Sequence, residues 1–303
     1  MVLLPLPAAA AEPALAAAPS QSVAISWDGT TETIDIELDP AAELTGFIFP
    51  TPSKPTVTAG DPALFDALER AIAPVQLVED DWWGRRQADL GTPIPDQKTP
   101  AAQLEPAIVA ATDTKALSRW LKKNDFEVTD ATAAALTGYA KDGWSFTLLS
   151  LDASAASTPI HLEFPAKSVV YPLRLTAGSE TPMSYRMYVF GEGRTELRQF
   201  PRTRRELDAA RSTVWAGRVT DSTLARFGAF LTVTDLRIDA PETQVTTDIA
   251  VVDARANDDV IPSVVVYRPI TLLGFPLGWL IVCWGGIGAL VGVGYLANRF
   301  RAK

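Results

Sequence analysis

The sequence predicts an α+β protein: a mainly antiparallel β domain with a few short helices, followed by one C-terminal transmembrane helix. Short segments in which apolar and polar residues alternate recur between turn residues along residues 21–268, a pattern typical of antiparallel sheets. Only a few segments between them space their apolar residues as a helix does. From Ile270 to Ala297 no residue is charged, and about 20 apolar helical residues suffice to cross a bilayer core.

Residues 1–20 form a signal-like segment rich in Ala and Pro. Met1–Leu6 is apolar, and Ala8–Ala18 consists almost entirely of small residues, as before an A-x-A-like cleavage site. No basic residue precedes the apolar run, and Pro5 interrupts it. We expect the mature fold to begin near Gln21, and a flexible Ala/Pro tail is the alternative.

The domain is expected to open with a β-hairpin. Val23–Trp27 and Thr31–Leu38 both alternate, and Asp28-Gly29 between them is a typical hairpin turn. Gly46–Phe49 adds a short apolar strand that ends at Pro50.

Three helices are expected to follow. The first starts at Asp61-Pro62, an N-cap and a first helical residue. The second starts after the cap Thr112-Asp113, and the third covers Asp130–Asp142 and ends at Gly143.

Between the first two helices, Val75–Pro106 is expected to form a long loop. It holds several Pro and Gly residues and an acidic run next to two Trp and two Arg residues. Loops of this length are usually functional or disordered. We predict a partner-contact loop made by Glu79, Asp80, Asp81, Trp82, Trp83, Arg85 and Arg86.

The rest of the outer domain is expected to be mainly strands, with one short helix in the Arg-rich stretch Arg194–Arg211. Residues 21–268 form either one extracytoplasmic domain or two subdomains that meet near residue 150. The expected strands are Trp144–Leu151, Ile160–Phe164, Val169–Leu175, Met183–Phe190, Phe230–Ile238, Gln244–Val252 and Ser263–Arg268.

The charge distribution excludes some functions and orients the chain. The net charge is −9 and the sequence pI is about 4.8, which argues against a nucleic-acid partner. Arg299, Arg301 and Lys303 follow the apolar segment, and positive charge next to a span stays in the cytoplasm. All acidic residues precede residue 269, so the outer part has 24 basic and 36 acidic residues, a charge of −12.

We therefore expect a single-pass protein of the cytoplasmic membrane, with the N-terminal domain outside. The transmembrane helix is placed at residues 269–298 and a basic cytoplasmic tail at residues 299–303, so the lipid bilayer is one partner. Gly285, Gly288 and Gly292 lie in this span, and the last two form a G-x-x-x-G pattern that lets another helix approach closely. The second expected partner is another membrane protein or a second copy of this chain.

Four short motifs, in order along the domain, resemble a bacterial family known as domain of unknown function 2330. They are Ser26–Thr33, Gly60–Phe65, Gly143–Phe146 and Tyr171–Leu175. The family is common in actinobacteria, and its members look like exported proteins with a signal peptide, a large outer domain and one C-terminal span. Members carry cysteines just after the signal, and this chain has none there. The resemblance implies no activity and therefore no catalytic residue.

Residues that could carry chemistry are few. One His and one Cys exclude a zinc, haem or iron–sulfur site built from such ligands, and also an intramolecular disulfide. His161 shares a strand face with Glu163, and catalysis there is weighed against an ordinary surface His. Neither the acidic run Glu79–Asp81 nor Asp253 with Asn257, Asp258 and Asp259 matches the spacing of a calcium loop. No cofactor, metal or catalytic residue is expected.

The leading hypothesis is a non-enzymatic accessory or interaction role in a cell-envelope or membrane complex. One alternative is an envelope hydrolase that uses the carboxylates of Glu79, Asp80 and Asp81, since neighbouring Trp rings favour sugars. The other alternative is an ion- or solute-sensing module.

Overall fold

The computed structural model describes residues 2–5, 20–38, 44–83, 106–110, 113–123, 128–150, 158–179, 182–199, 210–239, 241, 245, 247–272 and 275–284. The chain divides into two compact units. Residues 1–73 and 97–261 form the first, here called the main unit. Residues 74–96 and 262–303 form the second, here called the ribbon unit.

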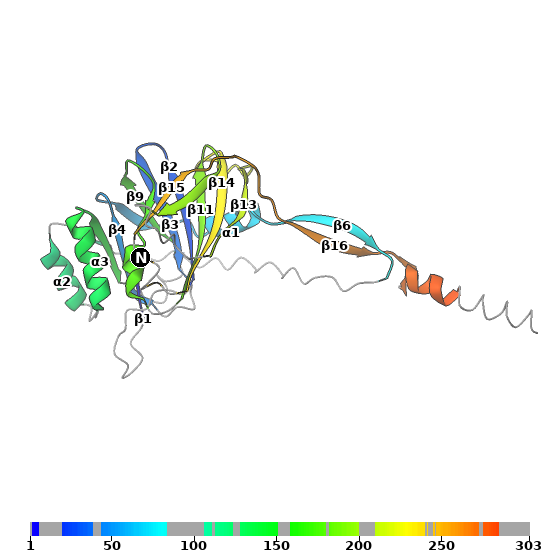
Figure 1. Ribbon diagram of the computed structural model, residues 1–303, viewed down its shortest axis with the longest axis horizontal. Coiled ribbons are helices and arrows are strands. Elements are labelled where there is room, and N and C mark those ends of the chain that lie inside the picture. The colour runs from blue at the N-terminus through cyan, green and yellow to red at the C-terminus, as the bar shows by residue number, and fades with distance from the viewer. Residues whose placement is uncertain are drawn as a thin grey trace, which may run out of the picture. The chain divides into compact units, whose positions relative to one another are not determined.

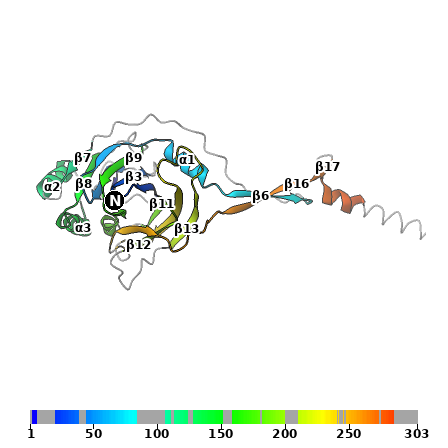
Figure 2. The ribbon, with the colours of Figure 1, turned by 90° about the horizontal axis from the view of Figure 1, so that it is seen from above.

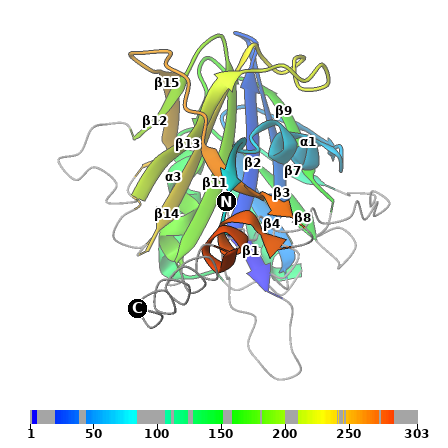
Figure 3. The ribbon, with the colours of Figure 1, turned by 90° about the vertical axis from the view of Figure 1, so that its right-hand side faces the viewer.

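A seven-stranded sheet is the centre of the main unit (Figure 3). All its neighbouring strands are antiparallel except the pair β11 and β2, which is parallel. The prediction of a mainly antiparallel β fold with short helices is therefore confirmed. In sheet order the strands are β13 (Ala210–Arg218), β14 (Phe230–Ile238), β11 (Met183–Gly191), β2 (Ser20–Trp27), β3 (Thr31–Leu38), β9 (Ile160–Pro165) and β5 (Thr56–Ala59).

The expected hairpin joins β2 and β3. Gly29 has a φ of 97°, which a residue with a side chain rarely adopts. The Asp28 carboxylate accepts hydrogen bonds from the backbone N–H groups of Thr30 and Thr31, each at 2.8 Å. The turn residues themselves thus set the strand register.

Two smaller sheets cover the inner face of the large one. The first has four strands, in the order β1 (Val2–Pro5), β4 (Leu44–Thr51), β8 (Ser145–Ser150) and β7 (Ala107–Val109). The second has three, in the order β10 (Val170–Tyr171), β15 (Ile249–Asp253) and β12 (Thr195–Gln199). Tyr171 lies between the layers, with its ring centroid 5.7 Å from Phe49 and 6.0 Å from Tyr185. The main hydrophobic core is therefore a layer of side chains between sheets.

Short helices cover the outer faces. Helices α2 (Thr114–Lys123) and α3 (Asp130–Lys141) pack against β4 and β8 (Figure 2). Helix α1 (Leu64–Ala71) packs on the other side, against the large sheet. The Thr129 hydroxyl accepts a hydrogen bond from the N–H of Thr132 and caps α3, and Gly143 beyond its end has a φ of 80°.

One stretch of the main unit is untested and another differs from the expectation. The described residues at the two ends of the Arg-rich stretch belong to β12 and β13, and the expected short helix between them falls on residues 200–209, which lie outside the described part. The expected strand Val169–Leu175 ends after two residues and continues as the 3-10 helix η2 (Arg174–Gly178). Pro172 has no N–H for a sheet ladder, and the N–H groups of the next two residues bond to a carboxylate instead.

The ribbon unit consists of a two-stranded parallel sheet, a short hairpin and a helical segment (Figure 1). Strand β6 (Val75–Asp81) pairs in parallel with β16 (Ser263–Pro269). The hairpin of β17 (Thr271–Leu272) and β18 (Phe275–Pro276) follows, and residues 277–284 are helical. The prediction of a loop from residue 75 is thus wrong for residues 75–81, which form a strand.

The first residues of the segment expected to span the membrane are not helical. Pro269, Thr271–Leu272 and Phe275–Pro276 are strand residues, and the helix begins at residue 277 directly after Pro276, whose fixed φ suits a helix start. Residues 285–298 lie outside the described part. Within the residues that the structure describes, no helix is long and apolar enough to cross a membrane.

Candidate functional site

The ribbon unit exposes four large aromatic side chains where β6 ends and the C-terminal helical segment begins. Their exposed fractions are 46% for Trp82, 51% for Trp83, 62% for Phe275 and 58% for Trp279. We call this set the aromatic end. Its two halves lie almost 200 residues apart in the sequence. Exposed rings in such a group mark a contact surface, because each would lose water-accessible apolar area in a complex.

Backbone hydrogen bonds join the two halves of the aromatic end. The carbonyl oxygen of Trp82 accepts the N–H of Gly278 at 2.7 Å, and that of Trp83 accepts the indole N–H of Trp279 at 3.1 Å. One residue earlier, the carbonyl of Asp81 accepts the N–H of Ile270 at 2.9 Å. The end of β6 is therefore bound directly to the first turn of the helical segment.

Gly278 makes this close approach possible. A Cβ atom at this position would lie 2.6 Å from the carbonyl oxygen of Trp82 and 2.8 Å from the Trp83 ring. Both distances are shorter than van der Waals contact, and one of the atoms is backbone. Any larger residue would therefore have to separate the two segments.

The acidic residues predicted as a contact loop lie on β6 in three different environments. Glu79 is exposed, and Asp80 forms an ion pair with Arg268, 2.7 Å from its Nη2. Asp81 is buried, and its Oδ1 accepts the N–H of Trp83 at 3.2 Å. Successive strand residues point to opposite faces, so Asp80 and Asp81 do not form a facing acid–base pair.

The structure thus brings five of the predicted contact residues, Glu79 to Trp83, next to the start of the predicted span. Arg85 and Arg86 lie outside the described residues, as do Gly285, Gly288 and Gly292. Sequence reasoning missed Phe275 and Gly278 as parts of this site. Two sequence features could have pointed to them: the Trp82-Trp83 pair and the aromatic residues at the start of the helical segment. Both expose large apolar side chains, which favours a contact between them.

A second cluster with chemical potential lies in the main unit, where His161 of β9 faces Asp35 of β3. His161 Nδ1 lies 2.8 Å from Asp35 Oδ1, and the Asp35 side chain is only 4% exposed. The hydrogen bond to Asp35 raises the pKa of His161. The partner of His161 is therefore a carboxylate on the neighbouring strand, in addition to Glu163 on its own strand. An isolated Asp between Ile34 and Ile36 was the only sequence signal.

Helix α1 is attached to the large sheet by a polar network. Glu69 accepts hydrogen bonds from the Tyr188 hydroxyl and from Arg186, and Arg186 also bonds to both carboxylate oxygens of Asp235, at 2.8 and 3.1 Å. Glu37 lies near this network. Its burial, and to a smaller extent the negative charges of Asp66 and Glu69 on α1, raise the pKa of its carboxyl group to about 7. This network holds α1 against β11 and β14.

Glu32, at the start of β3, is fully buried on the core side of the sheet. Both its carboxylate oxygens lie 3.3 Å from the N–H of Val170. Burial raises the pKa of this carboxyl group to about 8, since one backbone donor replaces little of its hydration. Glu32 is thus protonated at neutral pH.

A third polar cluster joins α3, η2 and the chain before β15. The Asp248 carboxylate accepts the N–H groups of Leu173 and Arg174, the Arg174 Nε at 2.9 Å and the Tyr139 hydroxyl. The Arg174 guanidinium also pairs with Asp142 at 2.9 Å and lies 3.9 Å from the centroid of the Tyr139 ring. The three side chains Tyr139, Arg174 and Asp248 are bonded to one another, which indicates a structural role.

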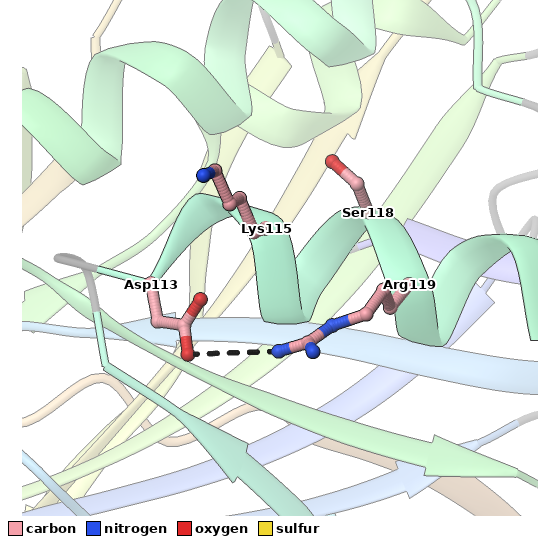
Figure 4. A pocket seen from close by; sticks show the side chains of 4 residues that line it. All are labelled: Asp113, Lys115, Ser118 and Arg119. Atoms are coloured by element: carbon pink, nitrogen blue, oxygen red, sulfur yellow. Dashed lines mark ion pairs between the residues drawn. The ribbon is translucent and has the colours of Figure 1, made fainter.

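The remaining candidates are weaker. A hollow of about 460 Å³ on α2 is lined by Asp113, Lys115, Ser118 and Arg119 (Figure 4). The Asp113 carboxylate already caps α2, because it accepts the N–H of Ala116 at 2.8 Å. The same carboxylate lies 4.0 Å from the Arg119 guanidinium. In the described ranges, no three His, Cys, Asp or Glu residues are grouped so as to hold a metal ion. Asn257 of the Asp-rich loop instead accepts the N–H of Arg194 at 3.0 Å.

These observations define an α+β protein in which three β-sheets and short helices form one unit and an exposed aromatic end belongs to another. The chain belongs to the bacterial family described as "Uncharacterized protein conserved in bacteria (DUF2330)", which it matches over residues 9–252. The resemblance of the four motifs is thereby confirmed at the level of the family. No curated protein matches the chain.

Among solved structures, the chain is similar to crystal structures of baculovirus P35. Two are of a mutated P35 after caspase cleavage, with 10% and 12% identity, TM-scores of 0.34 and 0.32, and coverage of 76% and 80% of this chain and 96% and 99% of P35. A third, of P35 itself, has 10% identity, a TM-score of 0.35 and coverage of 81% and 96%. Likeness at this level carries no functional argument.

Proposed function

We propose that this protein is anchored in the cytoplasmic membrane by its C-terminal segment and serves as an extracytoplasmic accessory or interaction subunit. The span of this anchor is residues 277–297, which number 21 and include no charged residue. At 1.5 Å per residue such a helix is about 31 Å long, close to the bilayer core of about 30 Å. It would begin where the helical segment begins.

The single observation that carries the proposal is the aromatic end. Trp and Tyr are enriched where transmembrane helices meet the headgroup region. Trp83 and Trp279 lie at the first turn of the helical segment, and Tyr295 lies near its other limit, before Arg299. An apolar segment with aromatic residues at both limits and basic residues beyond one of them has the pattern of a single span.

The orientation follows from the charges. Arg299, Arg301 and Lys303 favour a cytoplasmic C-terminus, and the acidic remainder of the chain would then lie outside. The resemblance to exported actinobacterial proteins with one span agrees with this arrangement.

The accessory role is supported by the G-x-x-x-G pattern at Gly288 and Gly292, which lets a second helix approach the span. Replacing both glycines by Leu is expected to abolish co-purification of a partner, or crosslinking of two copies, in mild detergent. Unchanged association would remove this support, and recovery of the wild-type bait alone and uncrosslinked would contradict an interaction role.

The anchor is tested by one charge at the centre of the segment. Ile287→Arg is expected to move the chain from the carbonate-resistant membrane fraction to the soluble fraction, because Arg at a span centre costs about 2.5–3.5 kcal/mol. Thr56→Arg, at an exposed position of β5, is the matched control and should stay in the membrane. Complete extraction of the wild-type chain by carbonate would overturn the proposal.

A second candidate function, hydrolysis, is favoured by the Asp35–His161 pair rather than by Asp80 and Asp81. A buried carboxylate bonded to His Nδ1 orients an imidazole for general base work. If this candidate holds, Asp35→Asn and His161→Gln would each abolish the release of soluble fragments from cell-envelope polymers. Equal release by both variants and the wild type would exclude it.

A further inference from the structure

We propose that Trp82 and Trp83 form a second membrane contact, so that the end of β6 enters the headgroup region beside the first turn of the span. This inference rests on the proposed anchor and adds a partner for residues far from it in the sequence. The occupant of the aromatic end is then the bilayer interface itself.

Depth is the first reason for this second contact. The hydrogen bonds from Gly278 to Trp82 and from Trp279 to Trp83 hold these residues at the level of the first helical turn. If the helix enters the membrane at residue 277, the end of β6 cannot stay in bulk water, because the two segments are in direct contact. The depth of Trp83 is thus set by the depth of Trp279.

The chemistry of the side chains is the second reason. An indole ring combines a large apolar face with one N–H donor, which suits the boundary between headgroups and acyl chains. The N–H of Trp279 is already bonded to the Trp83 carbonyl, so this ring can lie at the apolar side without losing a hydrogen bond. Trp82, Trp83 and Phe275 leave about half or more of their side chains exposed at the same end.

The distribution of charge along the ribbon unit is the third reason. Residues 270–284 include no charged residue, and Asp81, the nearest acid, is buried and bonded to the Trp83 N–H. The exposed acid Glu79 and the Asp80–Arg268 pair lie further back along the strands. Among the described residues of the ribbon unit, the exposed ionised groups thus precede the aromatic end, as expected for a segment that crosses from water into the interface. Arg85 and Arg86, which follow in the sequence, lie outside the described residues.

The consequence is an anchor with two attachment points. A single helix leaves a protein free to turn about the helix axis, whereas a neighbouring strand end inserted beside it restricts that rotation for the ribbon unit. A contact site on this unit would then face one fixed direction along the membrane plane.

The test uses the full chain in vesicles of phosphatidylethanolamine and phosphatidylglycerol, with Cys283→Ser to remove the native thiol. An environment-sensitive NBD dye is attached through Trp83→Cys, and separately through Val75→Cys as the matched control. Both positions are about half exposed, and Val75 begins β6 whereas Trp83 follows two residues after its end at Asp81, so the full length of the strand, about 20 Å, separates them. Lipids brominated near the headgroup quench a dye only where it is close to the interface.

We expect at least twofold stronger quenching at position 83 than at position 75, with the protein floating with the vesicles. Equal, weak quenching at both positions in floating protein would overturn the second contact and leave the anchor intact. Protein that does not float would contradict both proposals. Protection of position 83 only after a partner protein is added would identify the aromatic end as a protein-docking surface and overturn the inference.

A variant that separates the two segments makes the result more specific. Gly278→Val places a side chain where 2.6 Å is available and is expected to release the end of β6 from the helix. Quenching at position 83 should then fall at least twofold while flotation is unchanged. Undiminished quenching would show that Trp83 does not owe its depth to the helix, which contradicts the inference.

Discussion

The main unit and the ribbon unit use the same kinds of apolar residue in opposite ways. In the main unit Ile25 and Val189 are at most 2% exposed, because sheets and helices cover both faces of each layer. In the ribbon unit Leu77 and Val78, on opposite faces of β6, are 48% and 57% exposed. An isolated two-stranded sheet is marginally stable in water, and parallel pairs normally occur buried on both faces. The main unit therefore provides its own apolar surroundings, whereas the described strands of the ribbon unit leave apolar side chains exposed, as the proposed membrane anchor would require.

The strongest test of this contrast removes the same side chain from each unit. Phe49→Ala in the core, where the ring contacts Phe47 and Tyr171, is expected to cost about 3–5 kcal/mol of unfolding free energy. Phe275→Ala in the ribbon unit, where the ring is mostly exposed, should cost less than about 0.5 kcal/mol in detergent-free buffer. Urea unfolding followed by near-UV circular dichroism measures both, and equal losses would contradict the contrast between the units.

A buried carboxyl group in the main unit makes the stability of the protein depend on pH. Glu32 has a pKa of about 8 in the folded protein against about 4.5 unfolded, so the folded state holds its proton longer. Stability is then unaffected below pH 4.5, falls as the pH rises from 4.5 to 8, and levels off above. Glu32→Gln should remove this fall and stabilise the protein by a few kcal/mol at pH 8, because each tenfold difference in proton affinity is worth about 1.4 kcal/mol. The measurement is the urea midpoint at pH 5 and pH 8, and parallel pH profiles for both proteins would refute it.

Two Asp→Asn variants test whether a polar contact contributes more to the free energy of unfolding when it is buried than when it is exposed. Asp248→Asn weakens the charge-assisted bonds to the half-buried Arg174 and is expected to cost about 2–3 kcal/mol. The control is Asp239→Asn, which breaks the pair with Arg237; both side chains there are more than 60% exposed, so the cost should be below about 1 kcal/mol. Thermal or urea unfolding measures the stability lost in each variant. An equal loss in Asp239→Asn and Asp248→Asn would argue against burial as the cause of the difference.

The weakest effect concerns His161, the only histidine of the chain. The hydrogen bond that the Nδ1–H of His161 donates to Asp35 raises the pKa of His161, so this pair adds stability that is present below pH 6.5 and is lost as the pH rises through the folded pKa. Asp35→Asn should lower the pKa of His161, which NMR can follow through a single imidazole signal. A pKa unchanged by the substitution would mean that Asp35 does not hold the imidazolium.

The parts that the sequence predicted well are those coded by neighbouring residues. Asp28-Gly29 forms the hairpin turn through its own side chain and backbone, and α3 starts and ends at its capping residues because these interactions span at most four positions. The pairing of β6 with β16 joins segments 188 residues apart, as the Arg268–Asp80 bond shows, and no local pattern specifies it.

The same reason explains the missed site residues. Asp35 and His161 are 126 residues apart and meet only because β3 and β9 are neighbours in the sheet. Strand β13 was missed because its first residues include Arg211, Ser212 and Thr213, which resemble a solvated surface in the sequence although their backbone pairs with β14. Gly278 does not have the positive φ that favours glycine. Glycine is needed there because a Cβ atom would lie too close to Trp82, which belongs to a segment distant in the sequence.

The place of β2 in the large sheet bears on how the chain folds during synthesis. Strand β2 lies between β3, which follows it at once, and β11, which ends at Gly191. At 5–20 residues per second the ribosome needs on the order of 10 s to make the chain between these neighbours. During this time one edge of β2 stays without its final strand, in a fold of high contact order. The nascent chain therefore cannot complete its central sheet until β11, and after it β13 and β14, have been made.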